Sequence, residues 1–143
     1  MTGIAGGELH VAAGVVESDD GRVLIAQSPG GGHMAGSWEF PGGKVAAGET
    51  VLQALSRELW EEIGIEVLAA EPFLRYRHAY PERVVILDVW LVKNYAGEPR
   101  ALEGQPLRWE SVDRLLDAGL LEADRPIVDA LLSKRSVETE RRG

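Results

Sequence analysis

The chain has 143 residues and a 45% apolar fraction, which suits one compact domain. Its 23 acidic and 15 basic residues give a formal net charge of −8, which argues against a general nucleic-acid-binding surface, since that needs a basic footprint. A small nucleotide stays possible, because a metal ion and a few local cations can hold a triphosphate. The chain has no cysteine, which excludes disulfides and thiolate metal sites. We find no signal peptide or long apolar segment, so we expect a cytoplasmic protein with no membrane and no protein partner.

The first half of the chain predicts two strands joined by a turn, then a short strand and a helix. Apolar and β-branched residues indicate strands over Glu8–Glu17 and Arg22–Gln27, with a Ser-Asp-Asp-Gly turn between them. A glycine-rich loop that begins at Pro29 leads to a short strand over Trp38–Phe40. A helix over Val51–Ile63 follows.

The second half predicts further strands and then two helices. The expected elements are extended segments over Ile65–Ala79, an apolar strand over Arg83–Lys93, a short strand over Leu107–Glu110, a short helix from Ser111 to near Gly119, and a last helix from Asp124 to about Lys134. This pattern favours an α/β fold, an α/β/α sandwich with a mixed central β-sheet. We expect a single domain over residues 1–135 and a mobile charged C-terminal tail over residues 136–143.

Local signals define both ends of the first helix. Thr50 can cap its start, and Gln53 completes a capping box. Gly64 stands where a helix ends in the left-handed conformation. Helical spacing predicts a buried apolar stripe formed by Leu52, Leu55, Leu59 and Ile63. We also expect Trp60 and Trp90 in the core.

Three glutamates of this helix lie close together. Glu58, Glu61 and Glu62 stand at i, i+3 and i+4, so they repel one another by roughly 0.2–0.5 kcal/mol per pair on an isolated helix. A divalent cation would offset this repulsion, and carboxylate oxygens suit Mg²⁺ or Mn²⁺. The alternative is a solvated acidic face, which is the commoner fate of three such residues.

A Pro-Gly-Gly-Lys stretch at residues 41–44 precedes the helix. Its two glycines let a backbone carbonyl or amide approach an ion or a phosphate closely. Lys44 offers a point charge to a phosphate. By itself such a stretch is a turn, so its significance depends on the acidic helix that follows it.

Loop and helix together carry a motif of fixed spacing. Gly43 is followed after five residues by Glu49, and after seven more by the continuous run Arg57–Ile65, which contains the three glutamates. This pattern resembles the Nudix box of the Nudix hydrolases. The likeness covers roughly Glu8 to Leu132. Three flanking stretches resemble the MutT branch of that family: residues 32–44, 103–106 and 123–126.

The resemblance implies a reaction as well as a fold. Enzymes of this branch hydrolyse a nucleoside triphosphate to a monophosphate and pyrophosphate with Mg²⁺, for which Mn²⁺ can substitute. Their preferred substrate is often an oxidised nucleotide such as 8-oxo-dGTP, whose removal before polymerases use it serves DNA repair. Three alternatives stay open: a cytosine nucleotide such as CTP or 5-methyl-dCTP, another nucleoside diphosphate derivative, and a non-catalytic nucleotide-binding module.

The resemblance also carries over site residues. The expected metal ligands are Gly42 through its carbonyl, Glu58, Glu62 and Glu103. The expected catalytic residues are Arg57, Glu58, Glu61, Glu62 and Glu103. Glu61 would assist through bound water, and Arg57 would orient Glu58. A carboxylate takes the proton of the attacking water, and both Glu58 and Glu103 are candidates for that base.

The expected substrate pocket departs from the MutT pattern at two positions. MutT-like enzymes often carry a phosphate-binding arginine where this chain has Gln27, and Lys44 or Arg83 can compensate. Asp124 stands where MutT has an asparagine. A protonated aspartate suits the O6 and N7–H of 8-oxoguanine, an ionised one suits the amine of cytosine or adenine, and a plain helix cap is the alternative. The other expected substrate-binding residues are His33, Glu39, Phe40 and Pro41.

Overall fold

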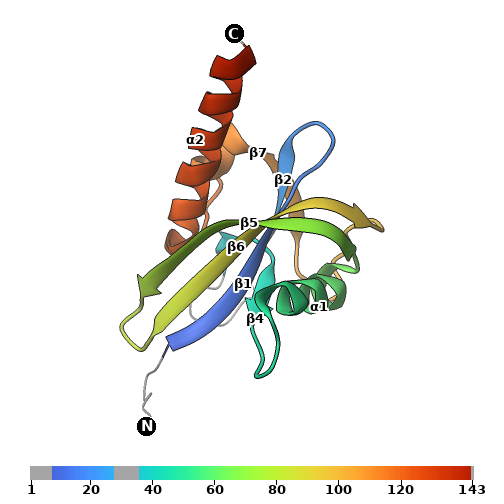
Figure 1. The fold of residues 1–143 in the computed structure, drawn as a ribbon, viewed down its shortest axis with the longest axis vertical. Helices are drawn as coiled ribbons and strands as arrows, with labels where there is room; N and C mark the ends of the chain where they lie inside the picture. The colour runs from blue at the N-terminus through green and yellow to red at the C-terminus, as the bar shows by residue number, and fades with distance from the viewer. Residues whose placement is uncertain (1–7, 28–35, 143) are drawn as a thin grey trace.

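The computed structural model describes residues 8–27 and 36–142, in which helices flank two β-sheets (Figure 1). The strands are β1 (Glu8–Val16), β2 (Arg22–Gln27), β3 (Trp38–Glu39), β4 (Gly42–Lys44), β5 (Glu66–Ala79), β6 (Val84–Ala96) and β7 (Leu107–Ser111). The helices are α1 (Val51–Ile63), the 3₁₀ segments η1 (Val112–Asp117) and η2 (Glu122–Asp124), and α2 (Arg125–Arg142).

The larger sheet is mixed, as the sequence predicts. Its strand order is β4-β1-β6-β5, and the smaller sheet has the order β3-β2-β7. Strands β1 and β6 run parallel with Ala13 opposite Val89, whereas the other strand pairs are antiparallel. The central parallel pair is therefore covered on both edges by antiparallel neighbours.

Strand β1 separates two hydrophobic cores. Its residues Ala13 and Val15 join a core with η1 and α2, whereas Ala12 and Val16 join a second core with α1. Successive side chains of a strand point to opposite faces, so α1 and α2 cover opposite faces of the sheet (Figure 1). The predicted α/β/α sandwich is confirmed. A side chain at Gly14 would come within 3.2 Å of Leu55 Cδ1, so this glycine lets α1 pack closely on the sheet.

Helix α1 begins and ends where the sequence predicts. The Thr50 hydroxyl accepts the Gln53 backbone N–H at 3.1 Å, and the Gln53 side-chain oxygen Oε1 accepts the Thr50 backbone N–H at 2.9 Å. Gly64 closes the helix in the left-handed conformation, with φ of 71°. The reciprocal capping box fixes the first turn, and so it fixes which side chains of α1 face the rest of the protein.

Two predictions about the packing of α1 were wrong. The buried face is formed by Ala54, Leu55, Leu59 and Ile63. Leu52 is 39% exposed and Trp60 is 61% exposed. At 3.6 residues per turn, Trp60 lies roughly 120° from the centre of the contact face and so faces solvent. Leu52 lies only roughly 40° from that centre, but it stands in the first turn, before the first buried residue, Ala54. Trp90 packs against the core on the α1 side, as expected.

Several boundaries also differ from prediction. Residues Gly42–Lys44 form strand β4, which pairs with β1, whereas the sequence suggested a turn. The short helix after β7 is a 3₁₀ segment that ends at Asp117. Helix α2 continues to Arg142 instead of ending near Lys134, because no glycine or proline interrupts residues 136–142 and Lys134 pairs with Glu138 one turn on, at 2.9 Å. Among the described residues, none of the helices is long and apolar enough to cross a membrane.

Candidate active site

Two adjacent glycines bring β4 close to β1 and to α1. A side chain at Gly42, whose φ is 155°, would come within 2.8 Å of Ala13 Cα and collide with the neighbouring carbonyl. A side chain at Gly43 would lie 2.6 Å from Glu58 Oε1 and closer still to the carboxyl carbon. The Glu58 carboxylate therefore packs directly against the β4 backbone, in space that only a glycine leaves free.

The Arg57 guanidinium organises the acidic residues around it. Its Nε and Nη2 donate to the two oxygens of Glu49 at 2.7 and 2.9 Å, in the bidentate geometry typical of arginine and carboxylate. Its Nη2 also donates to the Lys44 carbonyl at 3.0 Å, and its Nη1 lies 3.1 Å from Glu58 Oε2. This pairing lowers the pKa of Glu49 to about 2. Arg57 thus joins loop, strand and helix, and it contacts Glu58 as predicted.

The three glutamates of the helix lie in different environments. Glu61 is exposed, and its Oε1 lies 3.2 Å from Arg57 Nη1. The side chain of Glu58 is 18% exposed. Burial, a hydrogen bond with Glu58 and the charges of Glu58, Glu103 and Glu39 together raise the pKa of the Glu62 carboxyl to about 9. Glu58 and Glu62 form the inner pair of the predicted cluster, and Glu61 lies at its rim.

Residues 100–105 carry Glu103 to the carboxyl end of α1. The Leu102 N–H donates to the Glu62 carbonyl at 3.1 Å, and the Gln105 side-chain amide donates to the same carbonyl at 3.0 Å. The side-chain oxygen Oε1 of Gln105 in turn accepts the Glu103 backbone N–H at 3.0 Å. The last carbonyls of a helix need such partners. The buried Gln105 supplies one here and at the same time fixes the backbone beside Glu62.

The chemistry of this donor set fits a hard divalent cation. Carboxylates that raise one another's pKa are stabilised when a cation is placed among them. In the described parts of the chain, no group of three or more acidic or histidine side chains converges closely enough to hold a metal ion by itself. Magnesium typically takes one or two carboxylates and keeps water or phosphate oxygens as its other ligands, so a pair such as Glu58 and Glu62 is sufficient.

The cleft beside these residues has two adjoining parts. The acidic cavity, of about 230 Å³, is lined by Ala26, Gln27, Glu39, Phe40, Pro41, Gly42, Glu62, Glu103 and Gln105. The base cavity, of about 210 Å³, is mostly apolar and includes Val11, Phe40, Tyr80, Leu121 and Asp124. The two cavities share Glu39, Phe40 and Gly42. A ligand with a charged end and a flat apolar end could therefore occupy both parts.

Asp124 is a buried carboxyl in the wall of the base cavity. It is 4% exposed, and its Oδ2 accepts the Phe40 N–H at 3.0 Å. Burial is the main cause that raises its pKa, the Phe40 N–H opposes the rise and the Glu39 charge adds to it, so that the pKa lies at about 7. Although Asp124 immediately precedes α2, its carboxylate reaches across to the end of β3. A cap of its own helix is therefore not its main contact.

Some contributors to the site could be found from the sequence only in part or not at all. Tyr80, which the sequence places after a strand end near the expected pocket but without a role, lines the base cavity. The Tyr76 hydroxyl donates to the Ala123 carbonyl at 2.6 Å and so supports the residue before Asp124. Both tyrosines lie on or just after β5, whose sequence shows no local motif. Glu49 belongs to the Nudix box, but the spacing did not reveal that it is the main partner of Arg57.

Not every predicted substrate residue lines the cleft. Glu39, Phe40 and Pro41 do, and so does Gln27, whose side-chain amide donates to the Gly36 carbonyl at 3.0 Å. Lys44 and Arg83 are exposed and contribute to neither cavity. His33 lies outside the described residues.

Comparisons with known proteins agree with this architecture. The family model for the NUDIX domain matches residues 12–130. An 8-oxo-dGTP diphosphatase of Haemophilus influenzae is 42% identical over 127 residues, which cover 88% of this chain and 93% of that protein. A CTP pyrophosphohydrolase of Escherichia coli is 38% identical over 128 residues, which cover 90% and 94%. A solved structure from a study of MutT of Aliivibrio salmonicida and Vibrio cholerae has a TM-score of 0.78 at 35% identity, covering 89% of this chain and 98% of the other.

The chain belongs to the NUDIX domain family. The predicted class, a MutT-like Nudix hydrolase, is confirmed by the family match and by relatives named as diphosphatases, which this chain matches over nearly their whole length. Nudix hydrolases generally need a divalent metal ion, which the donor set around Glu58 and Glu62 fits.

Proposed function

We propose that this protein is a Mg²⁺-dependent nucleoside triphosphate pyrophosphohydrolase. It would release a nucleoside monophosphate and pyrophosphate, and its preferred substrates would be oxidised deoxynucleotides such as 8-oxo-dGTP. The observation that carries this proposal is the joined cleft, in which an acidic cavity for the phosphates adjoins an apolar cavity with one buried carboxyl. Removal of such nucleotides before polymerases use them would serve DNA repair, in the cytoplasm.

The acidic cavity accounts for the reaction type. Mg²⁺, or Mn²⁺ in its place, would be held by Glu58, Glu62 and the Gly42 carbonyl, with Glu103 nearby, and when bound it offsets phosphate charge and lowers the pKa of water. Phosphoryl transfer depends mainly on positioning and charge neutralisation. Arg57 contributes to positioning, because it holds one oxygen of Glu58 at 3.1 Å. Glu61, at the rim beside Arg57, would act through water.

The base that accepts the water proton is Glu58 or Glu103. Arg57 fixes the orientation of Glu58, which favours it for this role. Glu103 lines the acidic cavity, on a backbone that Gln105 anchors. Glu58→Gln and Glu103→Gln can be compared through the pH dependence of kcat. The variant of the true base loses the acidic limb of that profile, and the other variant keeps it.

Asp124 supports the choice of an oxidised purine. Because its pKa is about 7, the carboxyl is largely protonated below neutrality. A protonated carboxyl can donate to O6 of 8-oxoguanine and accept from its N7–H. Relatives at 42% and 36% identity are 8-oxo-dGTP diphosphatases.

A cytosine nucleotide is the second candidate. Above neutrality Asp124 is largely ionised and suits an exocyclic amine. The E. coli CTP pyrophosphohydrolase, at 38% identity, supports this alternative. Both candidates use the same acidic cavity, so they differ in the base cavity alone.

A panel of nucleotides with Mg²⁺ tests the proposal. Pyrophosphate and monophosphate release would be measured for 8-oxo-dGTP, dGTP, CTP, 5-methyl-dCTP and a nucleotide sugar, at pH 6 and pH 8. We expect 8-oxo-dGTP to have the highest kcat/KM at pH 6. Turnover of the nucleotide sugar alone, or release of inorganic phosphate in place of pyrophosphate, would refute the proposed reaction.

A further inference from the structure

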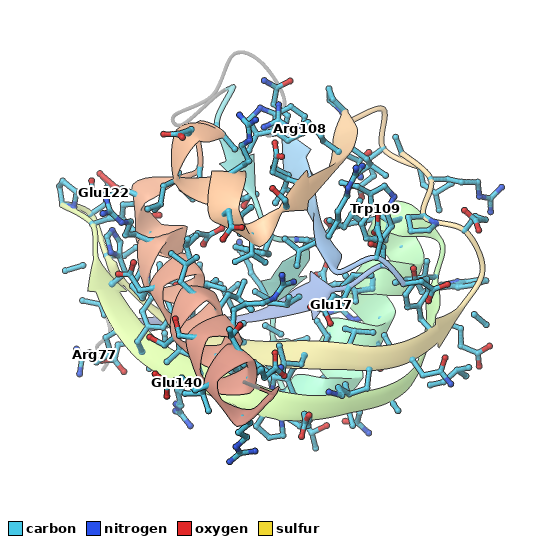
Figure 2. The ribbon with its side chains drawn as sticks, turned by 90° about the horizontal axis from the view of Figure 1, so that it is seen from above. Glu17, Arg77, Arg108, Trp109, Glu122 and Glu140 are labelled. Carbon is cyan, nitrogen blue, oxygen red and sulfur yellow. The ribbon has the colours of Figure 1, made fainter. Side chains whose placement is uncertain are left out.

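Arg108 lies on β7 but contacts the segments that carry the base cavity. It pairs across the smaller sheet with Ile25 of β2, and Trp38 of β3 pairs with Gln27 of the same strand. Residues two apart on a strand share a face, so Arg108 and Trp38 lie on one face, on either side of β2. Figure 2 shows Arg108 and Trp109 to either side of β7.

The guanidinium of Arg108 has one ring contact and two polar contacts. Its carbon lies 4.6 Å from the centroid of the Trp38 ring, a cation–π arrangement. Its Nη2 lies 3.4 Å from the Ala118 carbonyl and 3.2 Å from Glu110 Oε1. Its Nε is buried and has no hydrogen-bond partner among the described residues. A buried donor without a partner costs free energy, so the contacts with Trp38 and Ala118 must offset that cost.

Trp38 and the segment after Ala118 are themselves paired. The Trp38 N–H donates to the Gly119 carbonyl at 3.0 Å, and the Leu121 N–H donates to the Trp38 carbonyl at 2.8 Å. This is a parallel bridge between Trp38 and Leu120. Arg108 contacts both sides of it, the ring on one and the Ala118 carbonyl on the other. The arginine therefore acts as a clip across the pairing.

The two segments that Arg108 joins, after Trp38 and after Ala118, both lead into the base cavity. Two residues beyond Trp38, the Phe40 N–H donates to Asp124 at 3.0 Å. Three residues beyond Leu121, the Asp124 N–H donates to the Leu121 carbonyl at 2.9 Å. The two partners of the Phe40–Asp124 hydrogen bond are thus the ends of the two segments that Arg108 joins.

We propose that Arg108 is a positioning residue for base selection, which clips Trp38 to Ala118 and thereby sets how Phe40 and Asp124 face each other. Arg108 lines neither cavity, so it would act on the nucleotide through Phe40 and Asp124. The substrate readout of this inference rests on the proposed function, but the geometry of the clip does not.

Three variants test the clip. Arg108→Met keeps the aliphatic stem and removes the stacked charge, and Arg108→Lys keeps the charge without the planar fork. Arg114→Met is the matched control, an exposed arginine of η1 outside both cavities. We expect Arg108→Met to lower the ratio of kcat/KM for 8-oxo-dGTP over dGTP on the order of tenfold, as a small misplacement of a contact can. The change should lie in KM, Arg108→Lys should be intermediate, and Arg114→Met should match wild type.

A second readout needs no turnover. The Phe40 amide resonance, followed by NMR from pH 5 to pH 9, should report the titration of Asp124, next to which Glu39, Tyr76 and Tyr80 are the other ionisable groups. In Arg108→Met the amplitude of this titration should shrink, because the amide no longer faces the carboxyl. This result would stand even if the wild-type protein hydrolysed none of the nucleotides, so failure of the clip and failure of the proposed function are distinguishable.

The clip is overturned if Arg108→Met lowers Tm but keeps both the selectivity ratio and the Phe40 titration, since Arg108 would then be merely structural. If Arg108→Met does not fold, the same two measurements on Arg108→Lys test the clip. Reduced selectivity and a smaller Phe40 titration in the lysine variant would support the clip, and wild-type values for both would overturn it.

Discussion

The two halves of the cleft are assembled in opposite ways. The carboxylates at the edge of the acidic cavity come mainly from the loop and helix of residues 44–62, in which Arg57 ties Glu49, Glu58 and the Lys44 carbonyl together. Glu39 and Glu103 join them from other segments. The base cavity draws on distant segments, with Val11, Phe40, Tyr80 and Asp124 coming from different elements. The acidic cavity brings several negative charges close together, whereas the base cavity has a single buried carboxyl among apolar side chains.

This difference separates two tasks. Handling a phosphate chain needs several carboxylates at fixed spacing, which one helix and its preceding loop can provide. Choosing a base needs a cavity of defined shape with a few polar groups, which requires tertiary packing. Substitutions in the acidic cavity should therefore affect all nucleotides alike, whereas substitutions around the base cavity should change the preference among them.

The largest effect is expected from Glu58→Gln. Loss of one inner carboxylate removes a candidate metal ligand and base, so kcat should fall by about 10²–10⁴-fold. The loss should be the same for 8-oxo-dGTP, dGTP and CTP, measured by pyrophosphate release. Glu61→Gln, at the exposed rim, is the matched control and should lose much less. Equal losses in both variants would contradict the division into inner pair and rim.

Gly43→Ala tests the position of the Glu58 carboxylate through the backbone, although Gly43 itself lines the base cavity. The added methyl group would overlap the Glu58 carboxyl, so that carboxylate must move, and we expect kcat to fall by about 10²-fold for every nucleotide. Gly48→Ala is the control: it adds a methyl group to the same loop, with backbone strain at its φ of 83° but with nothing within 4 Å. If Gly48→Ala lost as much activity, a general disturbance of the loop rather than contact with Glu58 would be the cause.

Asp124→Asn tests the base cavity through pH. The folded-state pKa of Asp124, about 7, exceeds its ordinary value of 3.8. Wild-type stability should therefore be full below the ordinary value and fall as pH rises to about 7, by ~1.4 kcal/mol per pKa unit. The asparagine variant should show a smaller fall, because only the contribution of Glu62, whose pKa is also raised, remains, as denaturant unfolding at pH 5 and pH 8 can show. The kcat/KM of the wild type for 8-oxo-dGTP should also decrease above pH 7 relative to that for CTP.

A pH-independent selectivity ratio in the wild type would assign Asp124 a structural role. In that case the stability difference should persist, because it depends on burial and not on the nucleotide. The selectivity ratio of the wild type and the stability of Asp124→Asn therefore separate a residue that selects the base from one that merely supports the start of α2.

The same contrast explains what the sequence predicts. Helix α1, its caps and its acidic residues follow from local spacing, so their positions were predicted. The exposure of Trp60 was not, because residue type suggested burial while the helical position faces solvent. Strand β4 was missed because glycines have low strand propensity. What places Gly42 and Gly43 in a strand is tertiary contact with β1 and Glu58.

The base cavity shows more clearly what could not be predicted from the sequence. The motif at residues 123–126 singles out Asp124, but its partner Phe40 lies 84 residues away and its elevated pKa depends on burial. Lys44 and Arg83 were expected to replace a missing arginine, and both are exposed beyond the two cavities. A sequence pattern identifies which residue types are present, whereas their distance from the cleft depends on packing.

The smallest effect is expected at the edge of the base cavity. The His78 ring lies 4.6 Å from the Tyr80 ring, edge to face, and Tyr80 lines the cavity. Such pairs contribute about 0.5–1.5 kcal/mol. His78→Ala should raise KM for 8-oxo-dGTP by about threefold and leave kcat unchanged, because the ring supports a wall of the base cavity and touches no acidic residue of the cleft. His10→Ala, which removes the partner of Asp88, is the control. A fall in kcat for every nucleotide in His78→Ala would show that the two halves are coupled, and the separation between phosphate handling and base choice would not hold.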